Sequence, residues 1–190
     1  CADCCHAMFD VSLIEEIYIN HHFNRRFDGN AREALLEKAN RADRQVHKLK
    51  RMAHKANESG QPEEQILNDL AAERIRCPLL NAQDQCDLYE YRPITCRLYG
   101  IPTAIGGTGH TCGLSGFKPG TEYPTVNLDR IHDRLHEISE ALRQTIKSRY
   151  TGLATLLVPL SMALLTEYTE AYLGVADKER SEEQPGATDE

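Results

Sequence analysis

The seven cysteines, and where they fall along the chain, constrain the fold more than any other feature of this sequence. Three lie within the first five residues and four within one later segment: Cys1, Cys4 and Cys5, then Cys77, Cys86, Cys96 and Cys112. Cys1 and Cys4 have the C-x-x-C spacing, which places two thiols on one side of a tight turn where one ion can bind both. Side chains of adjacent residues point apart, so Cys4 and Cys5 are more easily given to two different metals, or to one metal and the core.

The later segment, residues 77–125, is the part of the chain that most needs an added constraint. Cys, Pro, Gly and Tyr replace the helical pattern there, and the run Gly106-Gly107-Thr108-Gly109 is typical of a loop. A loop of roughly fifty residues inside a compact domain is uncommon unless something ties it down. A bound metal would supply that tie, and metal binding would then be coupled to the folding of this segment.

Disulfides and buried free thiols are the alternatives to metal ligation. An odd number of cysteines leaves a thiol over from any set of disulfides, and no secretory signal is visible. Free cysteine packs as a small hydrophobe, but three cysteines within the first five residues, in a segment with little apolar content, disfavour simple burial. A lipid-modified Cys1 is disfavoured because no flexible tether follows it. We therefore predict metal ligation.

Apolar residues recur every three or four positions over much of the remaining chain, which is the period of an amphipathic helix. Ser12 and Glu15 have the capping-box spacing, and Asn127 is a candidate N-cap. We expect helices over about 12–22, 31–57, 62–75, 127–149 and 153–173, with the first one broken at Gly29 and the last one kinked or delayed by Pro159.

The predicted fold is therefore mainly α, with about five helices around an irregular, Cys-rich and metal-bound core. Residues 1–175 would form a single cysteine-cluster metal-binding domain. Residues 176–190 are polar and mostly acidic, and we expect a disordered tail there.

Charge is unevenly distributed along the chain. The 22 Lys and Arg against 29 Asp and Glu give a formal net charge of −7 at pH 7, which argues against nucleic acid as a general partner. Positive charge concentrates on residues 24–56. The 41–55 basic face of the expected helix either binds an acidic partner or is simply solvated. No apolar run reaches the roughly 18–20 residues of a membrane span, and the missing signal peptide favours a cytoplasmic protein.

The most specific motif runs from Cys86 to Arg97. It follows Cys77-Pro78-Leu79 and reads Cys86-x-Leu88-Tyr89-x-x-Arg92-Pro93-x-x-Cys96-Arg97. This pattern resembles the cysteine-cluster proteins of the CxxCxxCC or YkgJ-like family, a zinc- or iron-chelating domain. The family's opening motif, C-x-x-C-x-x-C-C, is matched in its last three cysteines by Cys1, Cys4 and Cys5, and its first would lie three residues before residue 1.

The resemblance implies that the protein binds zinc or iron, with an iron–sulfur cluster as one form of the iron. The implied ligands are the seven cysteines and one histidine: Cys1, Cys4, Cys5, Cys77, Cys86, Cys96, Cys112 and His110, with His6 as the alternative histidine. Arg92 and Arg97 would offset the negative charge of several thiolates around one ion.

Three functions remain open from the sequence. The first is a metal-binding protein in which the metal is at least structural. The second is an iron–sulfur enzyme or redox protein, because some members of the resembled family are flagellin lysine N-methylases; no cofactor-binding fingerprint decides whether the chain is an enzyme. The third is a zinc-stabilised interaction module whose 41–55 face binds an acidic partner.

Overall fold

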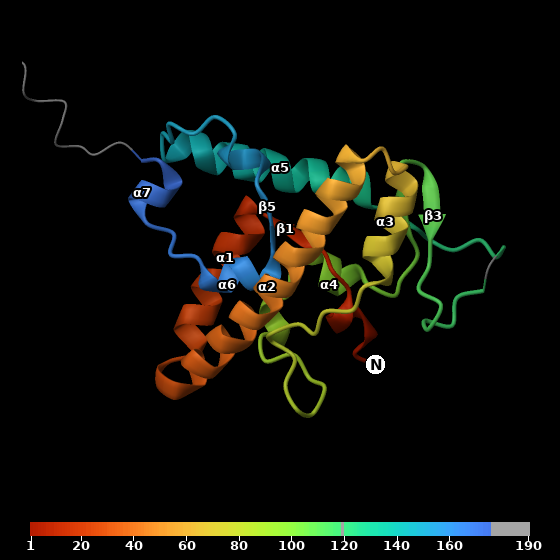
Figure 1. Ribbon diagram of the computed structural model, residues 1–190, viewed down its shortest axis with the longest axis horizontal. Coiled ribbons are helices and arrows are strands. Elements are labelled where there is room, and N and C mark those ends of the chain that lie inside the picture. The colour runs from red at the N-terminus through yellow and green to blue at the C-terminus, as the bar shows by residue number, and fades with distance from the viewer. Residues whose placement is uncertain (119, 176–190) are drawn as a thin grey trace, which may run out of the picture.

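The computed structural model describes residues 1–118 and 120–175 (Figure 1). The expected tail over 176–190 lies outside the described residues. Within them the fold is mainly α, as predicted, with seven α-helices rather than about five: α1 (Leu13–Arg26), α2 (Gly29–Glu58), α3 (Glu63–Ala72), α4 (Ile94–Leu98), α5 (Leu128–Thr145), α6 (Leu160–Leu165) and α7 (Glu170–Leu173). None of the helices in this part of the chain has the length and apolar character needed to cross a membrane.

Short strands and 3-10 turns join the helices. The 3-10 turns are η1 (Asp3–His6), η2 (Tyr89–Tyr91) and η3 (Leu153–Thr155), and the strands are β1 (Asp10–Ser12), β2 (Thr103–Ile105), β3 (Thr108–His110), β4 (Val126–Asn127) and β5 (Leu157–Pro159). β1 pairs antiparallel with β5, with Val11 opposite Val158. The second sheet has the order β3-β2-β4, in which β2 and β3 form a hairpin across Gly106 and Gly107. The run from Gly106 to Gly109, predicted to be a loop, therefore forms the turn of this hairpin and the first two residues of β3.

The predicted helix starts follow from their capping residues. Ser12 and Glu15 form the expected capping box, in which the Ser12 amide and hydroxyl both donate to Glu15 Oε2. The Asn127 side chain accepts from the Arg130 amide at 3.0 Å and caps α5. The break expected at Gly29 lies at residues 27–28 instead, and Gly29 is the first residue of α2.

The single helix expected over 153–173 is wrong. This stretch is divided into η3, β5, α6 and α7, because residues 157–159 adopt extended backbone to pair with β1. Pro159 is both the last residue of β5 and the N-cap of α6. Proline has no amide hydrogen to give to a preceding turn, so a helix can begin after it but cannot run through it. Pro159 thus delays the helix, which is one of the two outcomes predicted for it.

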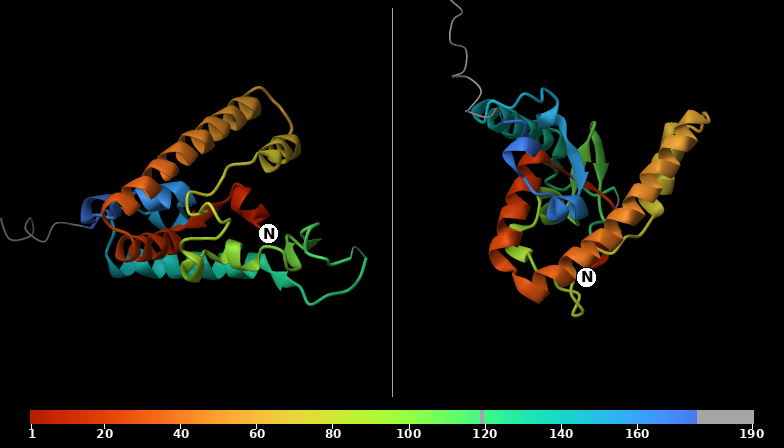
Figure 2. Two further views of the ribbon diagram at one scale, coloured as in Figure 1. Left: turned by 90° about the horizontal axis from the view of Figure 1, so that it is seen from below. Right: turned by 60° about the vertical axis from the view of Figure 1, so that its left-hand side comes forward.

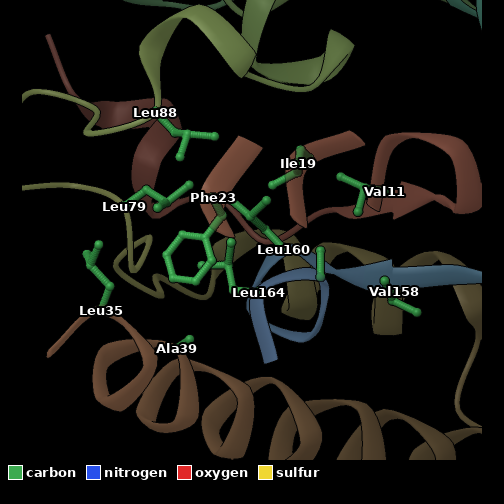
Figure 3. Packing of buried hydrophobic residues seen from close by; sticks show 11 residues of the cluster. Val11, Ile19, Phe23, Leu35, Ala39, Leu79, Leu88, Val158, Leu160 and Leu164 are labelled. Carbon is green, nitrogen blue, oxygen red and sulfur yellow. The ribbon is translucent and has the colours of Figure 1, made fainter. Parts of the chain in front are cut away.

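The main hydrophobic core lies where α1, α2 and α6 meet (Figure 3). Phe23 of α1 is fully buried, and Figure 3 shows it between Leu164 of α6 and the side of α2 that carries Leu35 and Ala39. Burying a side chain of this size stabilises a fold by roughly 1.5–3 kcal/mol. Leu79 and Leu88, from the irregular Cys-rich segment, belong to the same cluster. The Cys-rich segment is therefore anchored to the helical core by its leucines.

A second, smaller cluster lies further along α2. It consists of Ala42 and Val46 with Ile75, and Met8 and Leu49 pack against it. Beyond these residues the C-terminal part of α2 extends away from the other helices and carries α3 beside it (Figure 2). α2 therefore contributes to two separate apolar clusters.

One carboxylate is buried inside the helical layer. Glu16 of α1 is completely buried, and its Oε2 accepts a hydrogen bond from the Tyr168 hydroxyl at 3.0 Å. Its Oε1 has no hydrogen-bond partner among the described residues. Burial raises the pKa of Glu16 from its ordinary value of 4.5 to about 7, against a smaller lowering by the Tyr168 hydrogen bond. Burial, and then the charge of Glu16, raises the pKa of Tyr172.

We expect Glu16→Gln to stabilise the fold at neutral and higher pH. The folded carboxyl has the higher pKa, so it holds its proton more tightly than the unfolded one, and the wild-type free energy of unfolding falls as pH rises from 4.5 to about 7. The variant has no such loss, so it should exceed wild type by about 1–3 kcal/mol near pH 8 and by much less near pH 5. Urea unfolding at several pH values, at equal metal content, measures this; a difference that does not change with pH would contradict it.

Candidate metal centre

Backbone hydrogen bonds bring the two groups of cysteines together. The Cys77 amide donates to the Cys5 carbonyl at 2.7 Å, and the Ile75 amide donates to the His6 carbonyl at 3.0 Å. Outside the backbone, Arg74 forms an ion pair with Asp3 at 2.5 Å. The N-terminal turn η1 is thus held alongside the segment that leads into Cys77 (Figure 1).

A short turn joins the segment of Cys77 to the segment of Cys86. Leu80 and Cys86 form an antiparallel bridge, and the Asp87 amide donates to the Leu79 carbonyl at 2.8 Å. Asn81 closes the turn, because its side-chain oxygen accepts from the Gln83 and Gln85 amides at 3.0 Å each. The spacing of nine residues between Cys77 and Cys86 is therefore spanned by a hairpin-like turn that returns the chain toward Cys77.

Cys96 is positioned by α4, which begins after Pro93. Pro93 has extended backbone and cannot donate an amide hydrogen bond, so it suits the position before a helix. The Ile94 amide, exposed at the start of α4, donates to Glu15 Oε1 at 2.9 Å. Glu15 therefore holds two helix starts at once, since its other oxygen completes the capping box of α1.

These segments enclose one cavity of about 430 Å³, and six of the seven cysteines line it: Cys1, Cys4, Cys5, Cys77, Cys86 and Cys96. They come from two parts of the chain that are far apart in sequence, the N-terminal turn and residues 77–96. The Sγ atoms of Cys4 and Cys5 are 4.0 Å apart. No disulfide joins any of the seven cysteines, all of which are free in the structure.

The thiols in this cavity are poor acids. Burial raises the pKa of Cys77 from its ordinary value of 9.0 to about 12, and the neighbouring Cys86 and Cys5 raise it further. For Cys5, burial and then the adjacent Cys4 raise the pKa to about 11. Burial likewise raises the pKa of Cys96, to which Cys77, Cys4, Cys5 and Cys86 all add. These thiols therefore stay protonated at neutral pH in the absence of a bound cation.

One positive charge opposes this effect. The Arg92 guanidinium lowers the pKa of Cys5 and of Cys86, although burial of each thiol outweighs it and their pKa values remain raised. Arg92 is held in place because its guanidinium lies 3.6 Å from the centre of the Tyr89 ring and its Nε donates to the Tyr89 carbonyl. Arg97 has a different role, since it donates to the carbonyls of Arg92 and Glu90 and so braces the turn.

The residues present suit a soft metal ion, but they are not yet gathered around one point. Cysteine is the ligand that zinc and iron–sulfur centres prefer. Within residues 1–118 and 120–175, however, no three His, Cys, Asp or Glu side chains are already close enough to hold an ion together. A metal-bound core, as the sequence predicted, is thus not seen directly. The six cysteines share a cavity, and their side chains would have to turn inward to bind metal.

Cys112 and His110 lie apart from this group. Both line a second cavity of about 280 Å³, together with Tyr99 and Leu98 from the end of α4. Burial raises the pKa of Tyr99, and Cys112, Asp3 and Cys4 add to the shift. The structure therefore brings together six of the eight predicted ligands and places the other two at a separate cavity.

Comparison with known proteins places the chain in a family. The model of the CxxCxxCC family, described as a "putative zinc- or iron-chelating domain", matches residues 1–113. The chain belongs to this family. The match covers more than half of the chain and contains all seven cysteines, so it supports metal binding in general. No curated protein and no solved structure matches the chain.

Several residues that build the CxxCxxCC site could not be identified from the sequence. Glu15 was expected to cap α1, but its bond to Ile94 was not expected. Arg74 and Asp3 were not singled out at all. His22 of α1, which was not singled out either, stacks on Tyr91 with ring centres 3.7 Å apart. Each of these contacts joins residues far apart in sequence, and no local pattern marks them.

The 41–55 basic face lies on α2, and Arg41 at its start lines a pocket together with Cys77. Five cations follow one another at spacings of three and four residues and are exposed: Arg41, Arg44, Lys48, Arg51 and Lys55. Arg41 lies 3.8 Å from Glu37, and both side chains are well exposed. The face is turned away from the buried Ala42 and Val46 of the same helix. An acidic partner for this face stays a prediction.

We expect the metal-free CxxCxxCC domain to show graded thiol reactivity. A raised pKa leaves less thiolate at pH 8, so Cys77 and Cys96 should react with iodoacetamide about tenfold or more slowly than the exposed Cys1. Mass spectrometry of timed samples gives the rate at each cysteine. The matched control is the same chain in urea, where the rates should converge; equal rates in the folded chain would contradict the arrangement.

Proposed function

We propose that this protein is a metal-thiolate protein in which Cys1, Cys4, Cys5, Cys77, Cys86 and Cys96 provide the ligands for zinc or iron. The observation that carries the proposal is their common cavity, which brings the N-terminal turn together with residues 77–96. Membership of the CxxCxxCC family supports the same conclusion.

The role that we assign to the metal is structural in the first place. Residues 77–125 contribute Leu79, Leu80 and Leu88 to the buried core. The regular elements in the described part of this range are one 3-10 turn, one short helix and a hairpin. A metal ion bound by Cys77, Cys86 and Cys96 would cross-link this segment to itself and, through Cys4 and Cys5, to the N-terminal turn. Metal affinity then becomes part of the free energy of folding.

The protein groups around the cavity suit this role. Thiols must lose their protons before they bind a metal, and burial opposes that loss. Arg92 acts in the opposite direction, because its positive charge favours the thiolate forms of Cys5 and Cys86. Its side chain is fixed by Tyr89, so the charge stays next to the cysteines.

We expect single Cys→Ser substitutions in the cavity to remove metal and stability together. Cys86→Ser and Cys96→Ser should each lower the metal content per chain, measured by elemental analysis of protein purified without oxygen, and should lower the melting temperature by roughly 5 °C or more. Absorption spectra of the same samples assign the metal: zinc gives no colour, and an iron–sulfur centre absorbs in the visible.

Cys112→Ser is the matched control for these variants. Cys112 lines the neighbouring cavity with His110, so its substitution should leave the metal content near that of wild type. A loss as large as that of Cys96→Ser would bring Cys112 and His110 into the ligand set. A folded wild-type chain without zinc or iron would overturn the proposal.

Removal of the metal should loosen the Cys-rich segment before the helical core. Amide hydrogen exchange after treatment with a chelator should increase most over residues 77–112, and least at Phe23 and Leu164, which lie in the α1–α6 core. Restoring zinc or ferrous iron should reverse the change. Exchange that rises evenly over the chain, or not at all, would show that the metal is not the tie that holds this segment.

A further inference from the structure

The cavity beside the cysteines is larger and more apolar than a metal ion requires. Its volume is about 430 Å³, which lies within the range of about 300–1,000 Å³ for small-molecule sites. The cysteines form only part of its wall. The space next to them is bounded by side chains that cannot bind a metal.

These apolar walls belong to the two separate core clusters. Ala42, Val46 and Ile75 reach the cavity from the smaller cluster. Ile19, Leu79, Leu88 and Leu160 reach it from the main cluster. The cavity is therefore the gap between two packed regions that do not merge. A gap of this kind is costly when empty, because each wall loses the packing contacts that a neighbour would provide.

The charged residues that line the cavity leave it with one unpaired positive charge. Arg92 lines the cavity, and its Nε is used by the Tyr89 carbonyl, which leaves the terminal nitrogens of the guanidinium as donors. Arg76 and Asp84 also line it, but they pair with each other at 3.2 Å. The unpaired positive charge in the lining of the cavity therefore comes from Arg92.

From this arrangement we infer that the cavity is a binding site for a small, mainly apolar molecule with one anionic end, of the class of medium-chain carboxylates. The apolar part lies between the two core clusters, against Val46 and Leu160. The anionic end faces the terminal guanidinium nitrogens of Arg92. This inference rests on the proposed function and deepens it, because it gives the metal-bearing cavity a ligand.

The test uses decanoate as the probe and the metal-loaded full chain as the protein. Isothermal titration should give one saturable site per chain. Decan-1-ol has the same length without the charge, and it should bind more weakly. Substitution of Arg92 by Gln should remove this preference for decanoate over the alcohol. Equal binding of the two probes by wild type would overturn the assignment of the anionic end.

Filling the cavity should block the probe. Ala42→Phe places a large side chain in the gap and should weaken decanoate binding by about tenfold or more. Ala34→Phe is the matched control: Ala34 is exposed on the same helix and does not line the cavity, so binding should be unchanged. Val46→Met fills the gap with a more flexible side chain and gives the same test where Ala42→Phe does not fold.

Metal content measured on the titrated samples distinguishes failure of the ligand-binding inference from failure of the proposed metal-binding function. No saturable binding to a metal-loaded chain, or binding that both filling variants leave unchanged, would overturn this inference and leave the proposed function intact. A folded chain without metal would overturn the proposed function instead.

Discussion

The pairing of the N-terminal turn with residues 75–77 is the interaction on which the cysteine arrangement depends. Two backbone hydrogen bonds, from Cys77 to Cys5 and from Ile75 to His6, place the first three cysteines against the later ones. Backbone bonds fix position more closely than surface ion pairs, because they involve no long side chain. The ion pair of Arg74 with Asp3 is about half exposed and only reinforces them. Without this pairing the two cysteine groups would belong to different parts of the molecule.

The second constraint is the conflict between burial and charge. Burial keeps the cysteine side chains protonated, as the raised pKa of Cys77 illustrates, whereas metal ligation requires thiolates. A positive ion resolves the conflict, because it compensates for the lost hydration and for the mutual repulsion of the sulfurs. Arg92 supplies a smaller part of the same compensation. The positive charge of Arg92 alone does not keep the cysteines deprotonated, and a bound metal cation would supply the remaining stabilisation of the thiolates.

The sequence predicted those features that depend on neighbouring residues. The capping box at Ser12, the cap at Asn127 and the long helix over α2 were found because each signal lies within one helix turn or one repeating face. The cysteine motif from 86 to 97 indicated the family correctly for the same reason. The split of residues 153–173 was missed because its cause, the pairing of β5 with β1, joins positions about 150 residues apart. The capping of α1 by Glu15 was predicted, because Ser12 and Glu15 are close in sequence. Its bond from the Ile94 amide was missed, because no neighbouring residue indicates it.

The helix α2 explains why the cysteine cavity has an apolar side at all. Its N-terminal half packs Leu35 and Ala39 into the main core, and its next turns carry Ala42 and Val46 into a second cluster with Ile75. Ile75 in turn stands two residues before Cys77 and donates the backbone bond to His6. The same segment therefore closes the cysteine wall and completes the apolar wall opposite it. Because α2 carries both clusters, the space between them lies beside the thiols, where a metal site and an apolar ligand would share one boundary.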